Sequence, residues 1–135
     1  MNVLFFLTPK SQIKYVLDDM SIRQVLEFFE FHRYQVVPIL NKEGKYIGTI
    51  SEGDLLYYLK DHPFKSLNIF NNISMKEIER HIDYMPIDYN AQMDSLMIAA
   101  NNQNFVPVLD DKKNFIGIIT RKSIITYLYL KRDEN

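Results

Sequence analysis

The sequence predicts a mixed α/β protein in which one β-α-β-β-α unit occurs twice. The first observation is an internal repeat: Val37–Leu59 returns as Val106–Leu128, at a constant offset of 69 residues and without a gap. The second is its pattern, two apolar runs around a turn and then a helical spacing that opens on a hydroxyl residue. The third is length. At 135 residues the chain suits one compact body, so neither copy closes a core alone.

Identical residues fix the register of the two copies, and a repeat this long in so short a chain indicates a duplicated supersecondary unit. The identities are Val37-Pro38 and Val106-Pro107, Leu40 and Leu109, Ile47-Gly48 and Ile116-Gly117, Ile50 and Ile119, Tyr58-Leu59 and Tyr127-Leu128. Pro38 predicts an edge position or a strand end, because proline cannot donate to a ladder. Gly48 and Gly117 indicate close strand packing, and the chain has no glycine-rich phosphate loop.

The first half shows its elements in the predicted order. Ser21 and Gln24 have the spacing of a capping box, which places a helix start at Ile22. Ser51 caps the last helix of this half. The expected ranges are a short helix or strand at 3–7, strand 13–17, helix 22–33, strands 35–40 and 45–50, and a helix from Ser51.

The second half repeats this order after a stretch rich in proline and asparagine. The expected ranges are a short helix at 75–80, strand 82–88, helix 91–102, strands 104–109 and 114–119, and a helix from Ser123. We therefore expect repeat 1 at residues 1–61, a linker at 62–74, repeat 2 at 75–131 and a frayed tail at 132–135.

The composition of the chain argues against several classes of function. The 16 basic and 17 acidic residues leave a formal charge of −1, which predicts no nucleic-acid or membrane partner. No apolar run reaches the ~20 residues that span a bilayer, and the N-terminus lacks the basic region of a signal peptide, so we expect a cytoplasmic protein. The chain has no cysteine, and its three histidines show no ligand spacing. We find no nucleophile paired with a base, and we expect no enzyme, no catalytic residue, no metal and no cofactor.

The repeated motif resembles that of CBS domains. In copy one it consists of Pro38 within an apolar run, Gly48 in the next run, the hydroxyl of Ser51, and Asp54 three residues later. Two such units in tandem resemble a Bateman module, and the resemblance covers nearly the whole chain. It implies two repeats related by a pseudo-two-fold, packed through their sheets with clefts between them. It also implies a sensor of adenosine-containing ligands such as AMP, ADP, ATP, S-adenosyl compounds or cyclic di-AMP, commonly a homodimer.

Ser51 and Asp54 allow two compatible interpretations. A hydroxyl at the cap and a carboxylate in the first turn are typical of helix capping. The resemblance implies instead that Asp54 accepts hydrogen bonds from the two hydroxyls of a ribose, which an ionised carboxylate suits.

The second copy has Thr120, Arg121 and Lys122 in this place, with Ser123 where the carboxylate is expected. Two cations in a first turn oppose the helix dipole, at about 0.3–1 kcal/mol each, so an anion nearby would offset them. The alternative is that both are solvated. Because the acid occurs only in copy one and the cations only in copy two, one nucleotide could place its ribose on Asp54 and its phosphates near the cations.

By analogy with the family, the adenine slot is lined by the leading strands and the proline-containing strands. The residues are Tyr15, Val16, Val37, Pro38, Met85, Pro86, Phe105 and Val106. The prediction is thus a non-catalytic module that binds an adenine nucleotide of the AMP, ADP or ATP class between its repeats and signals to a separate protein. The alternatives are a cyclic di-AMP sensor, or a ligand-free dimerisation module with degenerate clefts.

Overall fold

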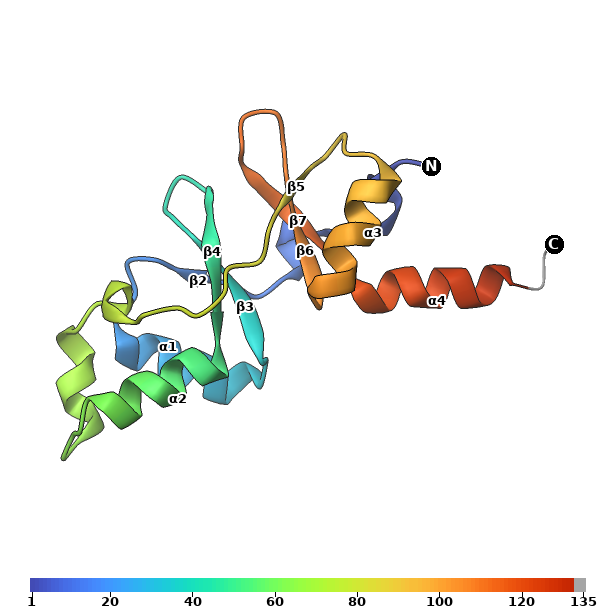
Figure 1. Cartoon of the computed structure of the whole chain (residues 1–135). Helices are drawn as coiled ribbons and strands as arrows, with labels where there is room; N and C mark the ends of the chain where they lie inside the picture. The colour runs from blue at the N-terminus through green and yellow to red at the C-terminus, as the bar shows by residue number, and fades with distance from the viewer. Residues whose placement is uncertain (133–135) are drawn as a thin grey trace. The chain divides into compact units, whose positions relative to one another are not determined.

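The computed structural model describes residues 1–132, and its elements follow the predicted order in both halves (Figure 1). They are η1 (Val3–Phe6), β1 (Thr8–Pro9), η2 (Lys10–Gln12), β2 (Val16–Leu17), α1 (Ile22–His32), β3 (Val36–Leu40), β4 (Tyr46–Ser51), α2 (Glu52–Asp61), η3 (Leu67–Asn72), η4 (Met75–Glu77), β5 (Ile87–Asp88), α3 (Met93–Asn102), β6 (Phe105–Leu109), β7 (Phe115–Thr120) and α4 (Arg121–Lys131), where η denotes a 3-10 helix. Within residues 1–132, no helix has both the length and the apolar character needed to cross a bilayer. Residues 133–135 of the expected tail lie outside the described range.

The chain forms two compact units. Residues 14–83 make up the first, here called the continuous unit. The second, the split unit, combines residues 1–13 with the chain from Tyr84 onward. We call residues 1–13 and 75–83 the leading segments, because each precedes the main part of its repeat in sequence. Residues 75–83 lie in the continuous unit with the main part of repeat 1, and residues 1–13 lie in the split unit with the main part of repeat 2. The repeat boundaries expected from the sequence stay a prediction.

The continuous unit contains a three-stranded sheet in the order β2-β3-β4, with β2 parallel and β4 antiparallel to β3. The expected capping box at Ser21 is confirmed, because its hydroxyl accepts from the Gln24 N–H and the Gln24 side chain accepts from the Ser21 N–H. Pro38 lies in the middle strand, but β2 pairs only with Ile39 and Leu40. The proline therefore occupies a stretch with one strand neighbour, and its missing N–H leaves no gap in the ladder.

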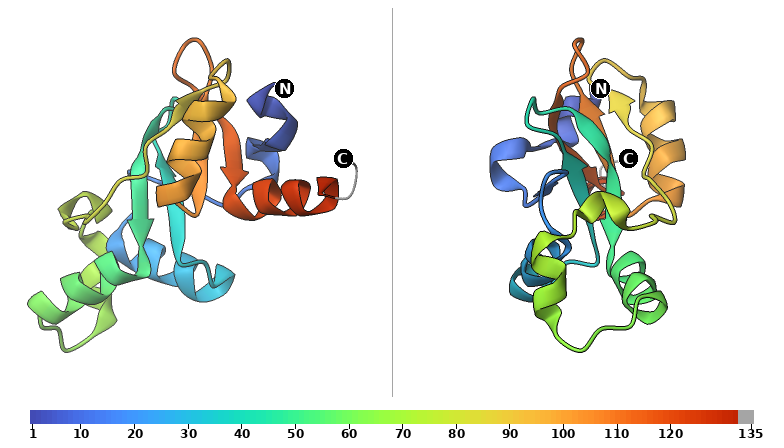
Figure 2. Two further views of the ribbon diagram at one scale, coloured as in Figure 1. Left: turned by 45° about the vertical axis from the view of Figure 1, so that its right-hand side comes forward. Right: turned by 90° about the vertical axis from the view of Figure 1, so that its left-hand side faces the viewer.

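The split unit contains a four-stranded sheet in the order β1-β7-β6-β5. Strand β1 pairs antiparallel with β7, with Pro9 opposite Gly117. Residues 3–7 resolve as the 3-10 helix η1, whose Val3 and Phe6 enter the core with Leu96 and Ile119. Strand β7 runs directly into α4 (Figure 2). The N-terminus of the chain is thus a structural part of this unit.

The stretch expected to be a linker also contributes to packing. Its 3-10 helix η3 lies beside α1 (Figure 2), and the Phe70 side chain is 2% exposed within the apolar core of the continuous unit. The Ile22 N–H donates to the Ile73 carbonyl at 2.8 Å. Residues 67–75 therefore pack against the rest of the continuous unit.

Four expected boundaries were wrong. The short helix expected at 75–80 ends at Glu77 as η4. The strands at 13–17 and 82–88 shrink to β2 and β5, which pair with β3 from Ile39 and with β6 from Val108. One residue earlier in each partner strand is a proline without an N–H to donate, which stops the parallel ladder there. The last helix begins at Arg121 instead of Ser123, because the Thr120 hydroxyl is the cap that accepts from the Ser123 N–H.

Candidate functional site

Asp54 lies in the first turn of α2 and is 5% exposed. Its Oδ2 accepts from the Ser51 N–H at 2.9 Å, while the Ser51 hydroxyl accepts from the Asp54 N–H at 3.1 Å. This reciprocal pair is a capping box, so the capping interpretation is confirmed. The box fixes the carboxylate in one orientation at the start of the helix.

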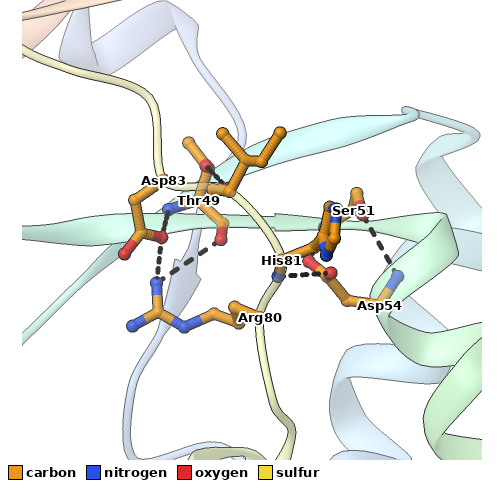
Figure 3. Close-up of polar contacts among 7 residues, drawn as sticks. Thr49, Ser51, Asp54, Arg80, His81 and Asp83 are labelled. Atoms are coloured by element: carbon orange, nitrogen blue, oxygen red, sulfur yellow. Dashed lines mark hydrogen bonds and ion pairs between the residues drawn. The ribbon is translucent and has the colours of Figure 1, made fainter.

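The second carboxylate oxygen of Asp54 is bound from outside its own helix. Its Oδ1 accepts from the backbone N–H of His81 at 2.9 Å (Figure 3). Both oxygens therefore already have a backbone donor. An ionised carboxylate offers about four acceptor positions, so one further position on each oxygen is available to a ligand hydroxyl.

Four residues fasten the segment around His81 to strand β4, and we call Thr49, Arg80, Ile82 and Asp83 the β4 clasp. The Arg80 guanidinium pairs with the Asp83 carboxylate and donates to the Thr49 carbonyl at 3.4 Å (Figure 3). Asp83 accepts from the Thr49 N–H at 3.0 Å, and the Thr49 hydroxyl donates to the Ile82 carbonyl at 3.2 Å. The clasp covers the edge of β4 that carries no other strand.

Gly48 makes room for this clasp. A Cβ at position 48 would overlap the Arg80 guanidinium and the Asp83 carboxylate. The expectation of close strand packing is thus wrong for Gly48, whose near neighbours are side chains. It is confirmed for Gly117, where a Cβ would meet the Thr8 carbonyl oxygen of β1 and φ is +155°.

A pocket of about 620 Å³ adjoins Asp54 within the continuous unit. Its wall contains four carboxylates, one guanidinium and two histidines, together with two tyrosines. The lining residues are Ser51, Gly53, Asp54, Tyr57, Tyr58, Asp61, His62, Glu77, Glu79, Arg80 and His81. The Tyr58 and His62 rings, both in this lining, stack with their centroids 4.0 Å apart. Residues 1–132 contain no group of three side chains arranged to hold a metal ion.

The corresponding helix start in the split unit is built differently. The Thr120 hydroxyl accepts from the Ser123 N–H at 3.0 Å, and the Ser123 hydroxyl donates back to the Thr120 carbonyl at 2.7 Å. Arg121 Nε donates to the Ala100 carbonyl at 2.8 Å, in the last turn of α3. This carbonyl, at the C-terminal end of α3, is a partner for the charge of Arg121 that the sequence did not show, and contact of Arg121 with an anion stays a prediction. Lys122 is exposed and makes no hydrogen bond or ion pair with residues 1–132.

The repeat, the motif and this geometry can be compared with known proteins. The family model for the CBS domain matches residues 7–61 and 93–130. The chain belongs to the CBS domain family. Proteins with this domain are generally regulatory and non-catalytic. An uncharacterised protein of Methanocaldococcus jannaschii is 26% identical over 141 aligned positions, which cover 84% of each chain.

Solved CBS structures share the whole fold. The protein CbpB in complex with c-di-AMP is 26% identical to this chain, with a TM-score of 0.84. The alignment covers 100% of this chain and 91% of CbpB. CbpB from Streptococcus agalactiae is also 26% identical, with a TM-score of 0.79 and coverage of 96% and 80%. A complex of CBSX2 with AMP has a TM-score of 0.72 at 19% identity, with coverage of 97% and 98%, and shows the fold alone.

Most residues expected to line an adenine slot in this CBS pair belong to the cores. The buried members are Val16, Val37, Pro38, Phe105 and Val106. Tyr15 and Pro86 are half-buried, and Met85 is 68% exposed. The structure therefore leaves only Tyr15, Met85 and Pro86 with substantial surface for a ligand.

Sequence reasoning missed the residues that hold the leading segments. The buried Gln103 side chain accepts from the Met85 N–H at 2.7 Å and donates to the Met85 carbonyl at 3.1 Å, like one residue of a neighbouring strand. Arg80 and His81 were missed as well. Their only signal was the ionisable run Glu79–His81 just before a predicted strand.

Proposed function

We propose that this CBS pair is a regulatory module that binds an adenine nucleotide in the pocket beside Asp54. The observation that carries the proposal is a buried, pre-oriented carboxylate with unused acceptor positions in the wall of a pocket of about 620 Å³. A ribose presents two vicinal O–H donors, which match the free position on each oxygen. The CbpB complex with c-di-AMP supports a ligand of this class.

The aromatic wall of the pocket suits the base. Tyr57 lines the pocket and is 62% exposed, so its ring is available for stacking. The rings of Tyr58 and His62 already form a stack at the same wall. Aromatic faces add about 1–3 kcal/mol for each stacked base in nucleic-acid complexes.

Among adenine nucleotides, cyclic di-AMP is the first candidate. The CbpB complex with c-di-AMP, at 26% identity, supports it more than the AMP complex at 19% identity does. Phosphate contact by Lys122, which makes no hydrogen bond or ion pair with residues 1–132, is part of the proposal. A cytoplasmic location, where such nucleotides occur, belongs to it too.

Isothermal titration of c-di-AMP, AMP and ATP into protein stripped of co-purified nucleotide tests the proposal. We expect binding by at least one nucleotide, and an affinity loss of about tenfold in Tyr57→Ala if one stacked base is lost. The matched control is Ile69→Ala, which removes an equally exposed side chain (55%) that does not line the pocket. Equal losses in both variants, or no binding, would reject the site.

One observation favours a second function. Both oxygens of Asp54 already hold backbone donors, and Arg121 is engaged by α3. A CBS pair with internally satisfied sites would act as a ligand-free interaction module. Absence of binding by every nucleotide tested would select this function.

The exposed apolar faces of the helices support a homodimer that signals to a separate protein. Phe31 on α1 is 82% exposed and Leu56 on α2 is 60% exposed. On α3 and α4, Ile98 is 68% exposed and Leu128 is 52% exposed. Apolar surface of this kind marks protein interfaces. Sedimentation equilibrium should give twice the monomer mass, and Leu128→Glu should reduce it if α4 forms the contact.

A further inference from the structure

We infer that the pocket beside Asp54 discriminates against adenosine polyphosphates and accepts an adenosine whose 5′ group carries no more than one negative charge. A phosphodiester of adenosine and a 5′-sulfonium compound both meet this description. The inference rests on the proposed function, because it concerns the ligand of the same pocket. Among the expected ligands, ADP and ATP should then bind with the lowest affinity.

The charges of the pocket wall carry the inference. Asp54, Asp61, Glu77 and Glu79 are carboxylates, and Arg80 is the one guanidinium in the wall. The four carboxylates and the one guanidinium together give a formal charge of −3. A ligand that enters therefore meets more carboxylates than cations among the charged side chains of the wall.

Arg80 does not supply the missing positive charge. It forms an ion pair with Asp83, which lies outside the pocket wall, and it donates to the Thr49 carbonyl (Figure 3). These contacts hold the guanidinium in the β4 clasp. To reach a polyphosphate as a free cation, Arg80 would have to leave Asp83 with an uncompensated charge against β4.

The discrimination grows with each phosphate. Two like charges about 7 Å apart in a water-like medium disfavour binding by about twofold to threefold. Asp61, Glu77 and Glu79 are exposed, so their effect is of this size and is screened by salt. ATP carries more charge than AMP, and AMP carries more than each phosphate of a phosphodiester. The affinity should therefore be highest for the phosphodiester, lower for AMP and lowest for ATP.

The buried carboxylate adds selectivity that salt does not remove. Asp54 is 5% exposed and receives both of its present hydrogen bonds from backbone N–H groups. It can bind a ribose O–H donor but offers nothing to a phosphate oxygen, because an ionised carboxylate only accepts. The floor of the pocket thus recognises the sugar, and the acidic rim limits the charge of the group attached to the 5′ carbon of that sugar.

The test compares the affinities of S-adenosylmethionine, c-di-AMP, AMP, ADP and ATP at low and high salt. In the wild type, we expect ATP to bind at least about tenfold more weakly than c-di-AMP at low salt, with a smaller ratio at high salt. The double variant Glu77→Gln with Glu79→Gln should reduce this ratio about fivefold. The matched control, Glu43→Gln with Glu52→Gln, removes the same charge outside the pocket and should leave the ratio unchanged.

Each outcome decides between the two claims. Similar affinities for c-di-AMP and ATP, or a ratio that the pocket variant does not change, would overturn the inference and leave nucleotide binding intact. A lack of binding by all five ligands would overturn the proposed function, and the inference with it. The melting temperature of each variant, measured alongside, shows that all of them are folded.

Discussion

The two units of this CBS pair cover the same sheet edge by different means. In the split unit, β1 pairs with β7 through the main chain, with Thr8 opposite Ile118. In the continuous unit, the equivalent edge of β4 is covered by the β4 clasp, whose contacts involve side chains of Thr49, Arg80 and Asp83. A backbone ladder resists local opening more than a few half-exposed side-chain contacts do. We therefore expect the covered edge to open more readily in the continuous unit than in the split unit.

The starts of α2 and α4 also differ in how they are connected to the rest of their units. Asp54 links its helix to the leading segment through the His81 N–H, whereas the Ser123 hydroxyl donates to the Thr120 carbonyl within its own turn. A change at Asp54 therefore affects the position of residues 77–83. A change at Ser123 stays local. This contrast favours a responsive site in the continuous unit.

The apolar anchors should give the largest effects. Phe70→Ala removes a side chain that is 2% exposed, and we expect a loss of about 3–5 kcal/mol in the free energy of unfolding. Phe6→Ala, at 7% exposure in the split unit, should lie in the same range. Urea titration measures both. A loss below about 1 kcal/mol for Phe70→Ala would show that its segment is a loose linker after all.

The two glycines test the difference between the edges directly. At Gly117 an added Cβ meets the backbone of β1 at a positive φ, so Gly117→Ala should destabilise by about 3 kcal/mol. At Gly48 it meets only side-chain ends, which can move, and Gly48→Ala should lose about 1 kcal/mol. Equal losses in thermal or urea unfolding would remove the distinction between ladder and clasp.

The helix starts should give smaller effects. Asp54→Ala removes a capping carboxylate and leaves the His81 N–H without its partner, with an expected loss of about 2 kcal/mol. Ser123→Ala removes one local hydroxyl contact and should lose less than about 1 kcal/mol. Amide hydrogen exchange adds a second readout. The His81 amide should exchange faster in Asp54→Ala and at the wild-type rate in Ser123→Ala.

The two cations of the second copy give the smallest effects. Arg121→Ala loses the contact with the Ala100 carbonyl and should destabilise by about 1 kcal/mol. Lys122→Ala should not lower stability, since this side chain has no partner among residues 1–132 and its charge opposes the dipole of α4. If Lys122 contacts a phosphate, its removal should weaken binding of c-di-AMP in calorimetry without any loss in melting temperature. A stability loss for Lys122→Ala equal to that of Arg121→Ala would contradict this separation of roles.

Local signals in the sequence predicted what is local in the structure. The repeat at an offset of 69 residues predicted the order of the elements, and the spacings Ser21–Gln24 and Ser51–Asp54 identified two helix starts, because a capping box is closed within four residues. The β4 clasp could not be predicted in this way. Thr49 is separated from the other members by more than thirty residues, and one of those members, Asp83, has no special sequence context.

Tertiary packing also reversed one charge argument. From the sequence, Arg121 opposes the dipole of its own helix. In the structure its guanidinium bonds to the C-terminal turn of α3, whose carbonyls attract a cation. The pattern of residues around position 121 contains no information about which helix end lies nearby. Site residues that depend on such neighbours need the fold before they can be assigned.

Binding of the nucleotide beside Asp54, in the continuous unit, is the proposal on which the others depend. Mapping of amide chemical shifts by NMR during a titration with c-di-AMP tests it most directly, because each residue reports separately. We predict that the changes concentrate at residues 51–57 and 77–81, with the His81 amide among the largest, since its acceptor would be shared with the ribose. Saturable changes that leave these amides unaffected would place the nucleotide elsewhere and contradict the proposed site.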